Sequence, residues 1–218
     1  MGYKIIFSEI TPYLPAFLKG LEISIIISII GMLIGSFIGM LAASGRTSSV
    51  YIVNKLVNVY VEIFRNTPLL IQMYLLYFGL AQFDIQISPF ISATLALTLN
   101  VGAYTAVIFQ TGINAVHKEQ REAAYALGMT SFQTFRYVIL PQAFRIVIPP
   151  LTNQFISVFL FSSVASTISV RELTYVTMNV ESITMRTFEA FIITAALYLI
   201  VTTVISLLSS VYEKSYKY

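Results

Sequence analysis

Uncharged polar side chains set inside long apolar stretches are the residues of this sequence that could do chemistry. An amide or hydroxyl within hydrocarbon needs a hydrogen-bond partner or water, so such residues either join helices or line the path of a polar solute. For any one of them, helix packing is the simpler interpretation. Together they could hydrate a zwitterion while most of the wall stays apolar, and we predict a solute path lined by Gln72, Asn100, Tyr104, Asn153, Gln154 and Ser157.

Residues suited to covalent, metal or nucleotide chemistry are scarce. The sequence has no cysteine and one histidine, His117, which we interpret as an ordinary surface residue. Thiol chemistry, iron–sulfur clusters and cysteine-ligated zinc are therefore excluded. No lysine follows a glycine, so the chain has no GxxxxGK[ST] phosphate loop. We predict no catalytic residue, no metal site, no nucleotide-binding site and no nucleic-acid partner.

The elements that must position the polar residues are membrane helices. The chain is 57% hydrophobic and 11% charged, against about 25% charged residues in soluble domains. Crossing the hydrocarbon takes about 20 apolar residues. We predict an all-α integral membrane protein, one transmembrane domain over residues 1–218, with about five transmembrane helices at residues 21–43, 56–80, 90–113, 146–168 and 188–208.

Two of these predicted helices carry unusual features. In the first, Gly31, Gly35, Gly39 and Ala43 recur every four residues on one face, which lets another helix approach closely. That helix could belong to a second subunit or to the same chain, and we favour the same chain.

The second predicted helix contains Pro68, and its apolar part, residues 68–80, is too short to cross alone. We therefore expect the helix to start near Leu56 and to kink at the proline. Glu62 and Arg65 then lie at the membrane boundary, spaced so that they can pair.

The distribution of lysine and arginine predicts the topology. Five spans place the two termini on opposite sides of the membrane. Eight lysines and arginines, including Lys214 and Lys217, lie on the side of the C-terminus, and four lie on the other side. By the positive-inside rule the N-terminus is outside and the C-terminus is cytoplasmic. The polar stretch after the third span is then cytoplasmic too.

This cytoplasmic stretch predicts a helical hairpin. Helix-forming residues fill 118–127, Gly128 interrupts them, and Ser131 offers an N-cap for a second helix that Pro141 ends. A hairpin with apolar and charged faces suits insertion into a groove on a soluble partner. The alternative is a helix lying on the lipid surface, which Arg136 and the neighbouring phenylalanines also permit.

The residues of this hairpin resemble the EAA loop of ABC importer permeases. The pattern Glu-Ala-Ala, three residues, Gly, nine residues, an aliphatic residue, one more, then Leu-Pro falls on Glu122, Ala123, Ala124, Gly128, Val138, Leu140 and Pro141, with Val138 where Ile is usual. Three further stretches narrow the resemblance to the polar amino-acid permeases: FLKGLEISI, FRNTPLLIQMYLLYFGL and MRTFEAF.

The resemblance implies a type I ABC importer permease that forms the path for an amino acid. The loop at about residues 117–141 would then form coupling helices that dock on a cytoplasmic ATPase dimer. That dimer binds ATP and Mg, and this chain is no enzyme and binds no cofactor. The other implied partners are a second permease subunit, either a copy or a paralogue, an extracellular or periplasmic solute-binding protein and the lipid bilayer, in the plasma (inner) membrane of a bacterium. The residues implied to couple to the ATPase are Glu122, Ala123, Ala124, Gly128, Leu140 and Pro141.

The sequence departs from this family where the family carries charges in the membrane. Val107 and Gln110 stand at positions usually held by Glu and Arg. Gln154, Leu160 and Phe161 stand at positions often held by Glu, Lys and Asp. The change fits a neutral solute, and it fits equally a heterodimer whose other subunit keeps the charged site.

A gradient-driven secondary transporter or channel for small polar solutes is the main alternative. It predicts an acidic residue buried in the membrane to bind a proton or sodium ion. Apart from Glu62 and Glu22 near helix ends, the sequence indicates none. A membrane-embedded enzyme is disfavoured as well, because it would need a nucleophile, paired carboxylates or a metal cluster. We therefore favour the permease.

Overall fold

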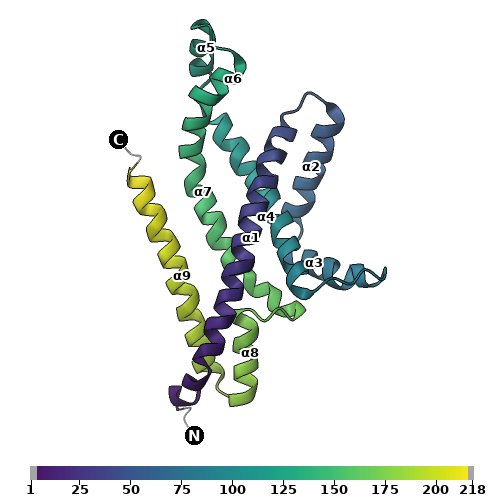
Figure 1. Ribbon diagram of the computed structural model, residues 1–218, viewed down its shortest axis with the longest axis vertical. Helices are drawn as coiled ribbons and strands as arrows, with labels where there is room; N and C mark the ends of the chain where they lie inside the picture. Colours follow the sequence, from purple (N-terminus) through teal and green to yellow (C-terminus); the bar gives the residue numbers. More distant parts are fainter. Residues whose placement is uncertain (1–3, 216–218) are drawn as a thin grey trace.

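The computed structural model describes residues 4–215, and this part of the chain is helical without any strand (Figure 1). Four of its helical segments are long and apolar enough to cross a membrane: Phe7–Arg46, Pro89–Asn114, Ser131–Ile168 and Thr187–Tyr212. They correspond to the helices α1 (Leu14–Arg46), α4 (Pro89–Asn114), α7 (Leu140–Phe161) and α9 (Thr187–Ser215). Four of the five predicted spans are thus continuous helices.

The prediction of a continuous helix over residues 56–80 is wrong. Helix α2 (Tyr51–Asn66) ends before Pro68, and the chain resumes as α3 (Leu69–Tyr74) and the π-helix η3 (Leu75–Gly79). Thr67 is extended, with φ −112° and ψ 140°, because the proline ring disfavours helical backbone in the residue before it. Helix α3 leaves sideways from the end of α2 (Figure 1). The proline therefore breaks the helix instead of kinking it.

The glycine face of α1 packs against α4 of the same chain. A Cβ atom added at Gly31 would lie 3.2 Å from the Leu97 Cβ, and one added at Gly35 would lie 2.7 Å from the Val101 Cβ. The preference for packing within one subunit is confirmed, and this face is not a seam between subunits. Around this contact lies the main core, which also takes in Ile27, Met73 and Val158.

The hairpin after the third predicted span runs without interruption into the helix that follows it. It consists of α5 (Lys118–Ala126), α6 (Ser131–Gln133) and the π-helix η4 (Thr134–Ile139), which continues as α7. Pro141 does not end a helix, contrary to the prediction, but lies in the first turn of α7. The wide π turn just before it leaves room for the ring and for a residue without an N–H group. After α7 the chain tightens into the 3₁₀-helix η5 (Ser162–Ile168).

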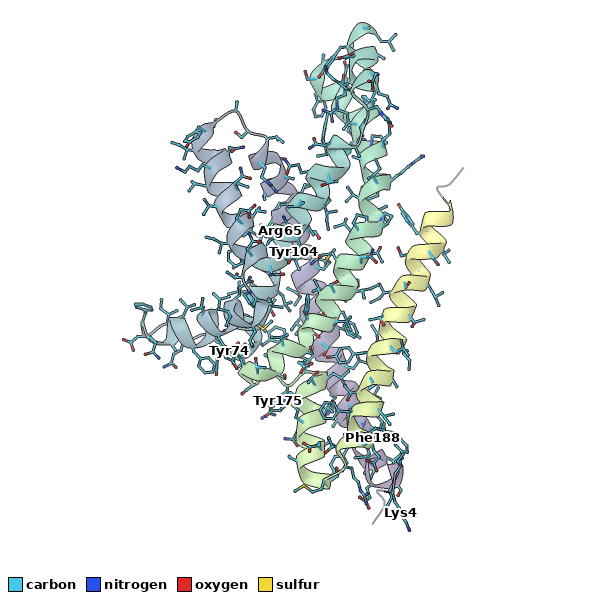
Figure 2. All side chains as sticks on the ribbon, turned by 180° about the vertical axis from the view of Figure 1, so that it is seen from behind. Lys4, Arg65, Tyr74, Tyr104, Tyr175 and Phe188 are labelled. Atoms are coloured by element: carbon cyan, nitrogen blue, oxygen red, sulfur yellow. The ribbon has the colours of Figure 1, made fainter. Side chains whose placement is uncertain are left out.

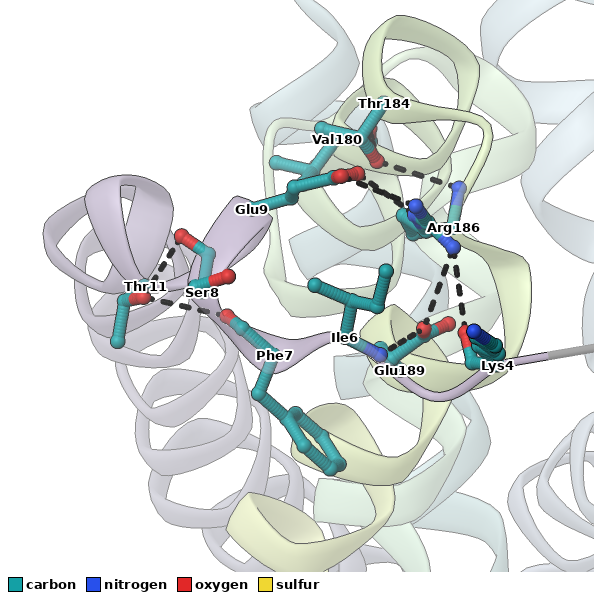
Figure 3. A network of polar contacts seen from close by, with 10 residues as sticks. All are labelled: Lys4, Ile6, Phe7, Ser8, Glu9, Thr11, Val180, Thr184, Arg186 and Glu189. Atoms are coloured by element: carbon teal, nitrogen blue, oxygen red, sulfur yellow. Dashed lines mark hydrogen bonds and ion pairs between the residues drawn. The ribbon is translucent and has the colours of Figure 1, made fainter.

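The end of the molecule opposite the hairpin is closed by short helices and a polar network. There lie η1 (Phe7–Glu9), η2 (Thr11–Tyr13) and α8 (Leu173–Thr184), which the sequence did not reveal (Figure 1). The guanidinium of Arg186 donates to both carboxylate oxygens of Glu9, at 2.6 and 2.9 Å, and the amide of Ile6 donates to Glu189 at 2.8 Å (Figure 3). The network fastens the start of the chain to the turn between α8 and α9.

The directions of the helices agree with the prediction that the chain crosses the membrane five times in alternating directions. Helices α1 and α9 both begin near α8 and run toward the end that carries α5 and α6 (Figure 1). Helices α2 and α3 together return the chain to the start of α4. The assignment of these ends to the two sides of a membrane stays a prediction. Among the charges it rests on, the side chains of Lys214 and Lys217 lie outside the described residues.

Candidate coupling hairpin and solute path

A left-handed glycine forms the turn of the hairpin. Gly128 has φ +79°, and a Cβ atom added there would meet no atom within 4 Å. Glycine is therefore needed for its backbone angle, not for space. Two residues later Thr130 and Gln133 form a capping box that starts α6. The N-cap is thus Thr130 and not the predicted Ser131.

Large apolar side chains are exposed on this otherwise polar hairpin. Leu127 is 82% exposed and Phe132 is 74% exposed. Glu122 and Ala123 are exposed beside them, and Glu122 forms an ion pair of 3.2 Å with Lys118. The hairpin extends beyond the ends of the neighbouring helices (Figure 1). Exposed apolar groups with a polar rim are typical of a protein-binding surface.

The base of the hairpin is fixed to the two helices that enter and leave it. Val116, Ile139 and Ala143 form a small buried cluster, and Arg121 donates to the carbonyl of Ile113 at 2.6 Å. Ala124 is buried on the inner side, whereas Leu140 and Pro141 are exposed on the stem. The hairpin is therefore packed at its base against both α4 and α7.

Two of the six predicted path residues, Gln72 and Asn100, lie together in the interior at the break of α2. Their side-chain amides donate to the carbonyl of Phe64, at 2.9 and 3.0 Å respectively. In an uninterrupted helix that carbonyl would accept from the residue four positions on, which is Pro68 and has no N–H. The two amides supply the hydrogen bonds that the proline cannot.

Tyr104 lies beside a cation that the sequence analysis left out of the path. The Arg65 guanidinium carbon is 5.3 Å from the centre of the Tyr104 ring, and the Tyr104 hydroxyl donates to the Arg65 carbonyl at 3.4 Å (Figure 2). Glu62 accepts from Asn66 at 2.7 Å instead of pairing with Arg65. Among the described residues, Arg65 forms no ion pair. The sequence could have indicated Arg65 as a path residue, because it is a cation in a stretch that had to enter the membrane.

The remaining predicted path residues form a separate group on α7. Asn153 and Ser157 lie one turn apart, and the Ser157 hydroxyl donates to the Asn153 carbonyl at 2.9 Å, with Gln154 adjacent. No hydrogen bond among the described residues joins this group to Tyr104 or to Gln72. A groove of about 500 Å³ between α1, α7 and α9 is lined almost wholly by apolar side chains and contains none of the six. The six residues therefore fall into separate groups, and none of them lines this groove.

Sequence reasoning also missed two buried carboxyl groups. Glu172 and Glu189 have no exposed area. Glu172 follows the third candidate span and caps α8. Burial raises the pKa of Glu172 to about 7, although hydrogen bonds from the Thr174 and Tyr175 amides, Ser24 and Tyr198 act to lower it. Each acid lies at the junction of distant segments, and such junctions are invisible in sequence periodicity.

Comparison with known proteins decides the family. Residues 35–218 match the family described as the binding-protein-dependent transport system inner membrane component. The chain belongs to this family. As an inner membrane component it is a multi-pass membrane protein, and we refer to it below as the permease.

Relatives and solved structures agree with this assignment. The permease is 37% identical over 212 residues to the glutamine transport system permease protein GlnP of Escherichia coli (strain K12), covering 96% of this chain and 97% of GlnP. It is 36% identical over 201 residues to the L-cystine transport system permease protein TcyB of Bacillus subtilis (strain 168), covering 92% and 86%. These relatives are permease subunits of transport systems.

The structural comparison confirms the predicted architecture. A chain in the crystal structure of an amino acid ABC transporter with histidines matches with a TM-score of 0.94 and 37% identity, covering 98% of this chain and 100% of that one. The inward-facing MetNI methionine ABC transporter shares the fold, with a TM-score of 0.73 at 18% identity. The permease therefore has the type I ABC importer fold.

Proposed function

We propose that the permease forms, with a second permease subunit, the path by which an amino acid crosses the membrane. An extracellular or periplasmic binding protein delivers the solute, and a cytoplasmic ATPase dimer that binds ATP and Mg drives the movement. The observation that carries this proposal is the match along the whole chain to a subunit of an amino acid ABC transporter. The second subunit is a copy of this chain or a paralogue.

The hairpin is the contact with the ATPase in this proposal. Its exposed apolar tip, with Leu127 and Phe132, suits a cleft on a soluble protein. Its projection beyond the other helices favours such a cleft over the lipid surface (Figure 1). The hairpin then lies in the cytoplasm and the N-terminus lies outside. Closure of the ATPase dimer moves two hairpins together, and the buried base passes this movement to α4 and α7.

The path runs along the face on which α2, α4 and α7 present polar groups. Tyr104, Asn153, Gln154 and Ser157 line it, and Gln72 and Asn100 maintain its shape by holding the break of α2 open. Arg65 adds a positive charge for the carboxylate of an amino acid, since a guanidinium binds carboxylates strongly. The uncharged Gln154, Leu160 and Phe161 fit a solute with a neutral side chain, or a paralogue that carries the charged groups.

The test is substrate-stimulated ATP hydrolysis in proteoliposomes that contain the permease, its ATPase and its binding protein. We expect one amino acid to stimulate hydrolysis, and the variants Gly128→Asp and Glu122→Ala to abolish or strongly reduce the stimulation. Glu22→Ala is the matched control, because Glu22 is an exposed glutamate near the opposite end of the bundle. Solute flux without any ATPase, or hairpin variants with normal stimulation, would refute the proposal in favour of a gradient-driven carrier.

A further inference from the structure

The carboxylate of Glu172 is held by donors from three helices. Its Oε1 accepts from the Tyr175 amide at 2.8 Å, and its Oε2 accepts from the Thr174 amide at 2.9 Å. The Ser24 hydroxyl of α1 and the Tyr198 hydroxyl of α9 also donate to Oε2, each at 3.2 Å. All four partners are donors, which suits a carboxylate and not an amide. One side chain therefore caps α8 and joins it to two membrane-spanning helices.

Helix α8 meets α1 at backbone distance. A Cβ atom added at Gly20 would lie 3.0 Å from the Leu173 Cα and 3.1 Å from the Glu172 carbonyl oxygen. The Ser24 hydroxyl also accepts from the Leu173 amide at 3.2 Å. The contact leaves no room for the two helices to slide past each other.

Helix α8 is joined to α9 along more than one turn. The Tyr198 hydroxyl lies 3.1 Å from the Thr174 hydroxyl, and the hydroxyls of Thr177 and Thr194 form a buried hydrogen bond. The apolar side chains of Leu173 and Val180 are buried in the cluster that α1, α8 and α9 share. The three helices thus form one packed unit at this end of the molecule.

The connections of α8 to α7 and to α9 each contain a left-handed residue. Between η5 and α8 lies Ser169, which has φ 68° and ψ 23°. A non-glycine residue in this left-handed region is uncommon. Met185, between α8 and α9, lies in the same region with φ 55°. The 3₁₀ turns of η5 extend α7 up to this residue. The chain thus turns on both sides of α8, so the position of α8 depends on the contacts that hold it to α1 and α9.

We propose that Glu172 is a positioning residue for transport, because its carboxylate binds α8 to α1 and α9 as one rigid body relative to which α7 moves. This inference rests on the proposed transport function. When ATP closes the hairpins, α7 is displaced at its hairpin end. A fixed α8 converts this displacement into a change at the opposite end of the path. If α8 lacks its hydrogen bonds to α1 and α9, it moves together with α7, so ATP is hydrolysed without moving solute.

The functional test separates two roles of the Glu172 carboxylate, which are its hydrogen bonds to α1 and α9 and its capping of α8. Glu172→Ala removes both, so Ser24→Ala and Tyr198→Phe are used, because each removes one hydroxyl donor and leaves the Thr174 and Tyr175 amides on the carboxylate. The readout is the number of solute molecules imported per ATP hydrolysed, which a lower yield of folded complex does not change. We expect a several-fold loss in this ratio for each variant and a larger loss for the pair.

Ser28→Ala is the matched control. Ser28 is buried on α1 one turn from Ser24, and its hydroxyl donates to the Ser24 carbonyl at 2.6 Å without contacting Glu172. It should keep the wild-type ratio. An unchanged ratio in the Ser24→Ala, Tyr198→Phe double variant, or an equal loss in Ser28→Ala, would overturn the proposal. If the wild type shows no substrate-stimulated hydrolysis at all, the transport function fails instead.

A distance measurement tests the rigid body without reference to any solute. The chain has no cysteine, so pairs of spin labels can be placed by single substitutions in the assembled complex. Met178→Cys on α8 is paired with Leu33→Cys on α1 or with Phe161→Cys on α7, all three being exposed positions. We expect the α8–α1 distance to stay constant between nucleotide-free and ATP-bound states while the α8–α7 distance shifts. Equal shifts in both pairs would overturn the inference.

Discussion

Asn100 and Gln72, from α4 and α3, both donate a side-chain hydrogen bond to the carbonyl of Phe64. That carbonyl is four residues before Pro68, so no backbone amide can satisfy it within a helix. The break of α2 is thus stabilised by amides from two other helices. Two of the polar residues that first suggest a solute path, Gln72 and Asn100, thus stabilise the backbone at the break of α2.

Removing one of these amides should destabilise the fold. We expect Asn100→Ala to lower the free energy of unfolding by about 1–3 kcal/mol, the usual cost of leaving a buried polar group with a lost partner. Denaturant titration of the permease in detergent micelles measures it. Asn153→Ala, at an exposed position of α7, is the control and should cost much less.

The same relationship predicts a specific double-mutant result. Pro68→Ala restores an N–H group that can satisfy the Phe64 carbonyl. The cost of Asn100→Ala should therefore be smaller in a Pro68→Ala background than in the wild type, with a measurable interaction energy between the two sites. Strict additivity would show that Asn100 stabilises the fold in some other way.

The glycine face of α1 should tolerate no added methyl group where α4 is closest. In Gly35→Ala the new Cβ would lie 2.7 Å from the Val101 Cβ and 2.8 Å from the Thr98 carbonyl oxygen. We expect a loss of about 1–3 kcal/mol of folding stability, as in other overpacked sites. At Gly79 the nearest atom would be 3.9 Å away, so Gly79→Ala is the control and should unfold like the wild type.

The turn of the hairpin should depend on backbone angle alone. Gly128→Ala puts a Cβ into the left-handed region and should cost about 1–2 kcal/mol locally, whereas Gly128→Asn should cost less because Asn adopts this conformation more readily. We expect substrate-stimulated ATP hydrolysis to fall in the order Gly, Asn, Ala. An Ala variant as active as the wild type would contradict the need for φ +79° at this turn.

Arg65 should affect solute binding more than ATP hydrolysis without solute. We expect Arg65→Ala to raise the KM for import and to leave basal hydrolysis near its wild-type rate, because in the proposed path this guanidinium binds the solute carboxylate. Lys55→Ala is the matched control, since Lys55 also lies over a tyrosine ring, 5.7 Å from the centre of Tyr51, on the same helix α2. Equal changes in KM for both variants would exclude a specific role for Arg65.

The sequence by itself determined the features that depend on local composition and spacing. Apolar length determined four of the membrane helices, small residues every four positions determined the packing face of α1, and helix-forming residues on both sides of Gly128 determined the hairpin with its turn. Each of these follows from helix geometry within one segment, so no knowledge of distant contacts was needed.

Only the tertiary structure decided what became of residues whose partners are far away in the sequence. A proline in a membrane helix can kink the helix, break it or be accommodated within it. Pro68 breaks the helix, whereas Pro141 is accommodated in the first turn of α7. Asn100 and Gln72 supply the lost hydrogen bonds at the first, and the π turn of η4 accommodates the second. The sequence analysis did not single out Glu172, because two of the donors that make its burial possible come from α1 and α9. Burial of a charge depends on groups brought together by folding, and no local pattern records them.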